Sequence, residues 1–131
     1  MSVRLFTAPL ILLAIGVAAR AAGPGDAAAG KAYFSQMCMQ CHTADPTEGG
    51  GEIGPSLVGL IGRQAGVGDT RFLYSAALKG SKLVWNAATL DHFLADPATA
   101  VPGTTMPLPV PMKTDRDNLI AYFQSLSSGA Q

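Results

Sequence analysis

The residues with the most distinctive chemistry are Cys38, Cys41 and His42, which form a C-x-x-C-H sequence. Two thiols about one helical turn apart can each add to a vinyl group of one porphyrin, and the adjacent imidazole can then reach the iron as its proximal ligand. Covalent attachment also makes loss of the group difficult in a compartment where it could not be replaced. The spacing therefore predicts one covalently attached haem of the c type, ligated by His42.

Three other interpretations of this motif use the same residues. A Cys38–Cys41 disulfide beside an incidental histidine would suit a haem-free secreted binding module. A thioredoxin-like redox pair needs a βαβ context, which the sequence lacks. A zinc site needs further Cys or His ligands nearby, and the other histidine is His92. The mass of the purified mature protein separates covalent haem from the haem-free module, because thioether-bound haem survives denaturation.

A haem held by one histidine has a second axial position, which is either filled or open for chemistry. The downstream candidates are Met106, Met112, His92 and the lysines. Met106 lies in the sequence V-P-G-T-T-M-P, whose prolines and glycine indicate an irregular loop that could arch over a flat cofactor. A methionine is most often core filler, but this segment has no helical period. We expect Met106 to be the ligand, with Met112 as its rival and His92 on the surface.

Length and composition indicate one domain with much of its fold in loops. The chain has 131 residues, of which 48% are hydrophobic and 14% charged, which is too apolar for a disordered chain. Nine basic residues balance nine acidic ones, so nothing indicates nucleic-acid binding. The 15 glycines and 9 prolines favour loops, and two cysteines exclude a disulfide-dense scaffold.

Residues 1–22 have the pattern of a secretory signal peptide. Arg4 precedes an uncharged run from Leu5 to Ala19, and Ala19–Arg20–Ala21 fits an A-x-A cleavage site. The apolar run is shorter than the roughly 20 residues of a spanning helix, and a proline lies inside it. We expect cleavage after Ala21 or Ala22, a mature domain over residues 23–131, and a periplasmic location. The mature chain would have seven basic and nine acidic residues, a net charge of −2.

The mature chain reads as short helices joined by Gly- and Pro-rich loops, with no convincing strand and no repeat, so we predict an all-α fold. The expected helices are Ala27 to about Met37 capped by Asp26, Arg71–Lys79 stopped near Gly80, Ala87–Ala95 capped by Asn86, and a last helix capped by Thr114 with Asp117 completing the box. Asp96–Pro97 should end the third helix, and residues 98–111 show no regular pattern. The residues expected to pack around the haem or around the contact between the first and last helices are Phe34, Leu57, Leu60, Tyr74, Leu90, Phe93, Leu94 and Leu119.

From about Asp26 to Leu126 the chain resembles the soluble class I cytochromes c of mitochondria and bacterial periplasms. The resemblance rests on the C-x-x-C-H motif, Gly30, Phe34, G-P-S-L at 54–57, Phe72, Tyr74, Ser75, Trp85 and P-G-T-T-M at 102–106. It implies a class I cytochrome c fold of short helices and Gly- and Pro-rich loops around one covalent haem. In that fold the first helix would pack against Leu119 and Tyr122 of the last helix.

The resemblance also implies roles for residues around the haem. The Pro55 carbonyl would accept a hydrogen bond from the second ring nitrogen of His42, which fixes the tautomer and makes the imidazole more basic. Arg63 would lie near a propionate, and Tyr74 and Trp85 would donate hydrogen bonds to a buried propionate. The methionine of P-G-T-T-M would be the sixth ligand.

Two residues of the expected haem pocket depart from the family pattern. Phe93 stands where many members carry a tyrosine whose hydroxyl meets the ligand sulfur. Leu78 stands where many members carry an asparagine beside a buried water. Both differences make the pocket more apolar.

The expected docking edge departs from the family pattern as well. Members that dock on acidic partners carry a ring of lysines around the exposed haem edge, and three lysines here, Lys79, Lys82 and Lys113, cannot form one. The matching edge positions are Met37, Ala98, Thr99 and Thr105. We expect an apolar contact instead, formed by Met37, Met39, Leu108 and Val110.

The expected function is electron transfer and not catalysis. With both axial positions filled, the iron changes oxidation state with little geometric change, and a soft thioether in an apolar pocket raises the reduction potential. We expect a monomeric, non-enzymatic periplasmic carrier of single electrons. Its redox partners would be a periplasmic dehydrogenase, a cytochrome bc1-type complex or a terminal oxidase, with no nucleic acid and no membrane contact except through partner complexes. The alternatives are a dedicated acceptor of one periplasmic dehydrogenase or, with a labile sixth ligand, a small haem peroxidase or gas sensor.

Overall fold

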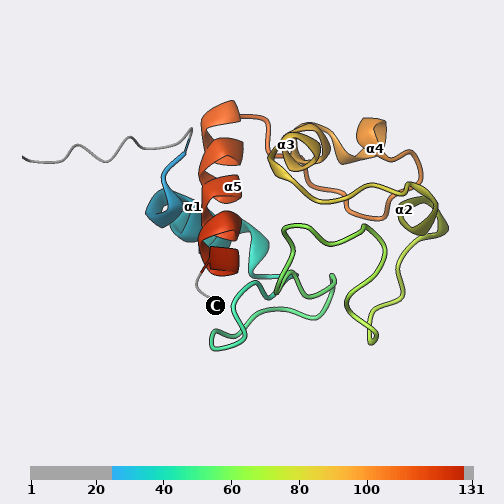
Figure 1. Cartoon of the computed structure of the whole chain (residues 1–131), viewed down its shortest axis with the longest axis horizontal. Helices are drawn as coiled ribbons and strands as arrows, with labels where there is room; N and C mark the ends of the chain where they lie inside the picture. The colour runs from blue at the N-terminus through green and yellow to red at the C-terminus, as the bar shows by residue number, and fades with distance from the viewer. Residues whose placement is uncertain (1–24, 129–131) are drawn as a thin grey trace, which may run out of the picture.

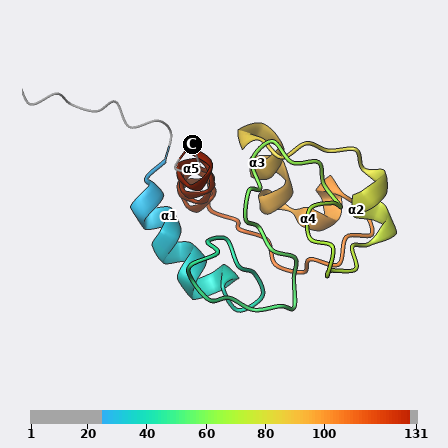
Figure 2. The same cartoon turned by 60° about the horizontal axis from the view of Figure 1, so that its bottom comes forward.

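The computed structural model describes residues 25–128, so the predicted signal peptide at 1–22 and its cleavage site lie outside the described residues. The helices are α1 (Ala27–Tyr33), the π-helical turn η1 (Phe34–Cys38), α2 (Ala76–Gly80), α3 (Ala87–Ala95), α4 (Pro97–Ala100) and α5 (Lys113–Ser128). Figures 1 and 2 show α1 beside α5, with α2, α3 and α4 grouped on the other side of the molecule. Over residues 25–128 the extended pairing is limited to one isolated bridge, Gln64–Val84, which confirms the all-α prediction.

The first helix starts where the sequence predicts and changes its winding before it ends. The Asp26 carboxylate accepts hydrogen bonds from the N–H groups of Ala28 at 2.8 Å and Ala29 at 3.2 Å. From Phe34 onward the winding is π-helical, and the N–H of Met39 donates to the Phe34 carbonyl at 2.9 Å. This turn delivers Cys38 at the end of the helical segment.

The terminal helices cross at a glycine, as the resemblance implied. Gly30 is buried, and a Cβ added there would overlap the backbone carbonyl of Asn118. The Asn118 side chain accepts a hydrogen bond from the Asp26 N–H at 2.8 Å. The Phe34 ring lies 5.7 Å from that of Tyr122, and Leu119 is fully buried beneath the crossing. Glycine therefore allows α1 and α5 to approach at backbone distance.

The predicted bounds of α3 are confirmed. Asn86 and Thr89 form a reciprocal capping box, in which the Thr89 N–H donates to Oδ1 of Asn86 at 3.0 Å and the Asn86 N–H donates to Oγ1 of Thr89 at 2.9 Å. One face of the helix is buried through Leu90, Phe93 and Leu94. Asp96 ends the helix, as expected.

The second helix is shorter than predicted and begins at Ala76 instead of Arg71. Ser75 caps it through its hydroxyl. The preceding residues are held by the loop before them, because the Arg71 N–H donates to Asp69 at 3.0 Å and the Tyr74 hydroxyl donates to the Val67 carbonyl at 3.0 Å. These side-chain bonds replace the first turn of the expected helix.

Two further differences concern helix starts. Asp96 also caps the short helix α4, in which Pro97 occupies the first position, so the segment expected to lack regular structure begins with one helical turn. The prediction of Thr114 as a cap is wrong, because α5 begins at Lys113 and Thr114 lies inside it as its second residue. Lys113 forms an ion pair with Asp117 at 2.7 Å along the helix surface.

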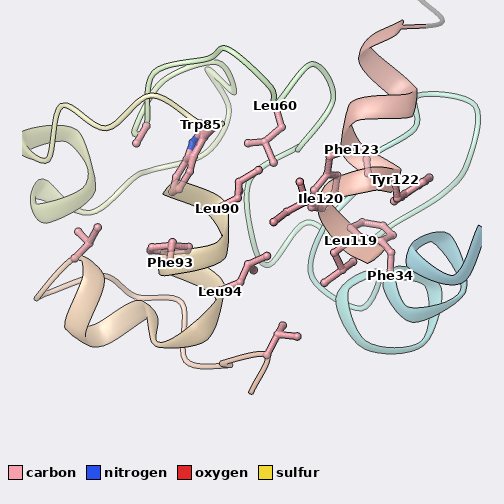
Figure 3. Close-up of a cluster of buried hydrophobic side chains, with 14 residues drawn as sticks. Phe34, Leu60, Trp85, Leu90, Phe93, Leu94, Leu119, Ile120, Tyr122 and Phe123 are labelled. Atoms are coloured by element: carbon pink, nitrogen blue, oxygen red, sulfur yellow. The ribbon is translucent and has the colours of Figure 1, made fainter. Parts of the chain in front are cut away.

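The core joins the two groups of helices. Figure 3 shows side chains of α3 facing those of η1 and α5. The expected core residues are buried except Leu57, which is half-buried. Ala44, Ala65, Trp85, Val101, Val110, Ile120, Tyr122 and Phe123 complete it. No helix within residues 25–128 has both the length and the apolar character to cross a membrane.

Candidate cofactor site

A cavity of about 240 Å³ lies between the two groups of helices. One water molecule needs about 10–15 Å³ by the same measure, so the space is suited to a much larger ligand. Its lining includes all eight residues predicted for the site: Cys38, Cys41, His42, Pro55, Arg63, Tyr74, Trp85 and Met106. The remaining walls are largely apolar and include Leu57, Leu60, Leu78, Leu90, Phe93, Leu94, Leu119 and Phe123.

The two cysteines lie at the end of η1 and in the turn that follows it. The N–H groups of Cys41 and His42 both donate to the Cys38 carbonyl, at 3.0 and 2.9 Å, and this tight turn keeps the three side chains together. Both thiols are free and partly buried. Burial raises the pKa of the Cys38 thiol to about 11, so this group stays protonated near neutral pH.

The His42 ring is oriented by two neighbours. Its Nδ1 lies 2.8 Å from the Pro55 carbonyl oxygen, the contact that the resemblance implied, and an N–H donated there leaves the lone pair on Nε2. A Cβ at Gly54 would overlap the ring, so the imidazole packs directly on the backbone. Burial lowers the pKa of His42, which favours the neutral, metal-binding form of the ring.

Arg63 brings an unsatisfied cationic donor to the cavity. Its Nη1 and Nη2 donate to the Val58 and Ser56 carbonyls, both at 2.9 Å. Its Nε is buried without a hydrogen-bond partner. A buried guanidinium donor without an acceptor is costly, and a carboxylate is the acceptor that offsets this cost best.

Tyr74 and Trp85 line the same cavity, but the Tyr74 hydroxyl makes other hydrogen bonds than the one to a propionate that the family resemblance implied. Its hydroxyl donates to the Val67 carbonyl at 3.0 Å and accepts from the Asp69 N–H at 3.2 Å. Donation to a propionate would require the bond to Val67 to open, because a hydroxyl has one proton. Trp85 is buried, with its ring 5.1 Å from that of Phe93 in an edge-to-face arrangement.

The candidates for the second axial ligand of the haem iron lie in different parts of the fold. Met106 is half-buried and lines the cavity. Met112 is 62% exposed and lies outside the lining, and His92 is exposed on α3, as expected. No lysine belongs to the cavity lining among the residues described.

The apolar residues exposed at the mouth of the cavity differ in part from those predicted for the docking contact. Met37 and Leu108 are 51% and 54% exposed and line the cavity, and Met39 is partly buried. The prediction for Val110 is wrong, because this residue is buried in the core and its N–H donates to the Leu94 carbonyl at 2.7 Å. Ile53, which the sequence did not single out, lines the cavity and is 77% exposed.

The residues present fit a haem. Apolar walls suit the macrocycle, paired thiols and a neutral imidazole suit attachment and ligation, and the unpartnered Arg63 Nε suits a propionate. Within residues 25–128 no group of three or more His, Cys, Asp and Glu side chains is placed to hold a metal ion by itself.

Comparison with known proteins agrees with this geometry. The family model "Cytochrome c" matches residues 27–127. Cytochrome c of Tetrahymena pyriformis is 43% identical over 103 residues, covering 78% of this chain and 90% of that protein, and cytochrome c2 of Rhodoblastus acidophilus is 40% identical over 105 residues, covering 79% and 95%. The solved structure of cytochrome cH from Methylobacterium extorquens is similar with a TM-score of 0.67 and 41% identity, covering 77% of this chain and 99% of that one. The chain therefore belongs to the cytochrome c family and has the all-α fold of its class I members.

Proposed function

We propose that the protein carries single electrons in the periplasm through one haem, joined to Cys38 and Cys41 and ligated axially by His42 and Met106. Membership of the family supports the coarser part, a haem c electron carrier. The observation that carries the finer part is that His42 and Met106 line one apolar cavity together with both cysteines, while Met112 is exposed outside it.

When bound, the haem supplies a reversible one-electron iron couple. The chain's own residues set the conditions for it. The two thiols retain the group, and the hydrogen bond between His42 Nδ1 and the Pro55 carbonyl orients the imidazole and increases its basicity. The apolar walls exclude water, which disfavours the additional charge of the ferric state and raises the potential.

Filled axial positions favour electron transfer over substrate chemistry. The loop that carries Met106 would keep external ligands from the metal, as a carrier requires. The exposed apolar side chains of Met37, Ile53 and Leu108 at the cavity mouth favour a brief, largely apolar contact with redox partners. We expect these partners to be a periplasmic dehydrogenase, a cytochrome bc1-type complex or a terminal oxidase, met by a monomer.

The ligand assignment is tested with a matched pair of methionine variants of the ferric holoprotein. Met106→Ala should abolish the weak far-red band of thioether ligation, lower the potential and speed the binding of imidazole and cyanide. Met112→Ala, the control, should change none of these. If Met112→Ala removes the band and Met106→Ala spares it, the assignment is wrong.

The attachment of the haem and the periplasmic location of the protein are tested separately. Cys38→Ala or Cys41→Ala should weaken haem retention in denaturant, which the mass of the denatured protein reports. The amino-terminal residue of protein recovered from the periplasmic fraction should be Ala22 or Gly23. A retained segment 1–22 would contradict the signal peptide without touching the haem assignment.

A further inference from the structure

The segment that follows Met106 has few backbone donors to fasten it. Pro107, Pro109 and Pro111 have no N–H, so only two of the five residues after Met106 can donate from the backbone. One of them is Val110, whose N–H donates to the Leu94 carbonyl of α3 at 2.7 Å. The returning half of the loop must therefore be held largely through its carbonyl oxygens.

Arg116 of α5 supplies the missing donors. Its Nη1 donates to the Val110 carbonyl at 2.9 Å and to the Pro111 carbonyl at 2.7 Å. Its Nε donates to Oδ1 of Asp91 at 2.8 Å. These bonds join the end of the loop that carries Met106 to α5 and, through the Asp91 carboxylate, to α3.

Arg116 is buried, although Asp91 leaves about a third of its side chain in solvent. A buried guanidinium is costly unless its donors are paired, and apolar residues of similar size often stabilise a fold as well or better. Its planar fork can reach two carbonyls and a carboxylate at fixed angles, which a lysine cannot do. The arrangement is therefore better explained by placement of the loop than by stability alone.

We propose that Arg116, oriented by Asp91, is a positioning residue for Met106. It fixes the return end of the loop at Val110 and Pro111, so that the thioether stays in place and external ligands are kept out. This inference rests on the proposed function, since it requires Met106 to be the sixth ligand.

The test measures imidazole binding and the far-red thioether band of the ferric holoprotein at a temperature where all variants are folded. Arg116→Gln and Asp91→Ala should raise the affinity for imidazole about tenfold, the effect expected from losing hydrogen bonds to a charged group, and should weaken the band. Asp91→Asn keeps an acceptor at the same place and should stay within about threefold of the wild type. Asp91→Ala decides the matter should Arg116→Gln fail to fold, because Asp91 is the more exposed partner.

Two controls on the same helix separate positioning from general weakening. Lys113→Gln removes the exposed ion pair with Asp117 and should leave imidazole affinity unchanged. Ile120→Val trims the buried face of α5 and should lower the melting temperature with little change in imidazole affinity. The inference is overturned if Arg116→Gln and Asp91→Ala behave like Ile120→Val. If Met106→Ala leaves the band intact, the ligand assignment has failed instead, and the positioning role falls with it.

Discussion

Gly30→Ala and Gly80→Ala make the same change in two helices with opposite surroundings. A Cβ at Gly30 would overlap the carbonyl oxygen of Asn118 and come within 2.9 Å of the Tyr122 Cβ. At Gly80 the same atom would meet nothing within 4 Å, and the residue does not have a positive φ. The pair therefore isolates the close approach of α1 and α5 from the intrinsic effect of alanine in a helix.

The expected free energies have opposite signs. Alanine gains about 1 kcal/mol over glycine in a helix interior. At position 30 the overlap costs about 3 kcal/mol, the upper end for overpacking, because the obstructing atom is backbone and cannot rotate away. The net effect of Gly30→Ala is a loss of about 2 kcal/mol, and Gly80→Ala gains about 0.5–1 kcal/mol.

Thermal unfolding of the ferric holoproteins, followed by circular dichroism, checks both values. At about 4–8 °C per kcal/mol for a domain of this size, Gly30→Ala should melt about 8–16 °C below the wild type and Gly80→Ala a few degrees above it. The reasoning fails if Gly30→Ala melts at or above the wild-type temperature, because the helices would then not meet at backbone distance.

Four other outcomes are expected. Lys82 has a φ of 58°, so Lys82→Gly should stabilise the fold by about 1 kcal/mol in chemical denaturation, and an unchanged midpoint would argue against that backbone. Phe93→Tyr should place a hydroxyl near the Met106 sulfur and shift the reduction potential with the fold intact; an unchanged potential would mean that Phe93 does not face the ligand. The electron-transfer rate with the natural partner should change only a few-fold between low and moderate salt, whereas a steep fall would point to steering lysines. The hydrogen bond from Arg116 lowers the pKa of Asp91, so the pair stabilises the fold above the ordinary pKa of 3.8, and this stabilisation is lost as the pH falls through the lowered pKa. In Asp91→Asn the free energy of unfolding, measured by chemical denaturation at a series of acidic pH values, should therefore fall less steeply with decreasing pH than in the wild type.

Helix starts with a side-chain cap were predictable because the interaction is local. Asp26 and Asn86 satisfy N–H groups two or three residues away, so residue type and spacing suffice to place α1 and α3. The role of Asp96 was harder to predict, since this one residue both ends α3 and caps α4. A proline after it is equally typical of a helix end and of a first helical position.

The error at α2 arose where side-chain bonds of the preceding loop compete with the helix for its first residues. The start of α2 is set by Asp69 and by the bond from Tyr74 to Val67, which hold residues 71–74 in the loop. The same bond directs the Tyr74 hydroxyl to a carbonyl, whereas the family pattern implied a propionate. A pattern of residue types cannot show which of two acceptors lies nearer.

The convergence of the eight site residues on one cavity was predictable, since the C-x-x-C-H motif places three of them together and the family resemblance assigns the other five to the same haem. Arg116 was missed, although a signal existed. It precedes Leu119, Ile120 and Phe123 by three, four and seven residues, so it stands on the apolar stripe of α5. A cation on that stripe requires hydrogen-bond partners within reach, and these are the Asp91 carboxylate and the Val110 and Pro111 carbonyls.

The crossing of α1 with α5 has a consequence for the order of events during synthesis. The Asp26 N–H and its acceptor on Asn118 are 92 residues apart, and closing a loop of that length costs about 4 kcal/mol before any constant term. A helix of 7 residues such as α1 is marginal on its own in water. The segment that ends in Cys38 therefore has no stable partner until the last helix has been made. Until α5 packs against this segment, Cys38 and Cys41 lie on a chain without fixed structure, and we expect both thiols to be accessible there for attachment of the proposed haem.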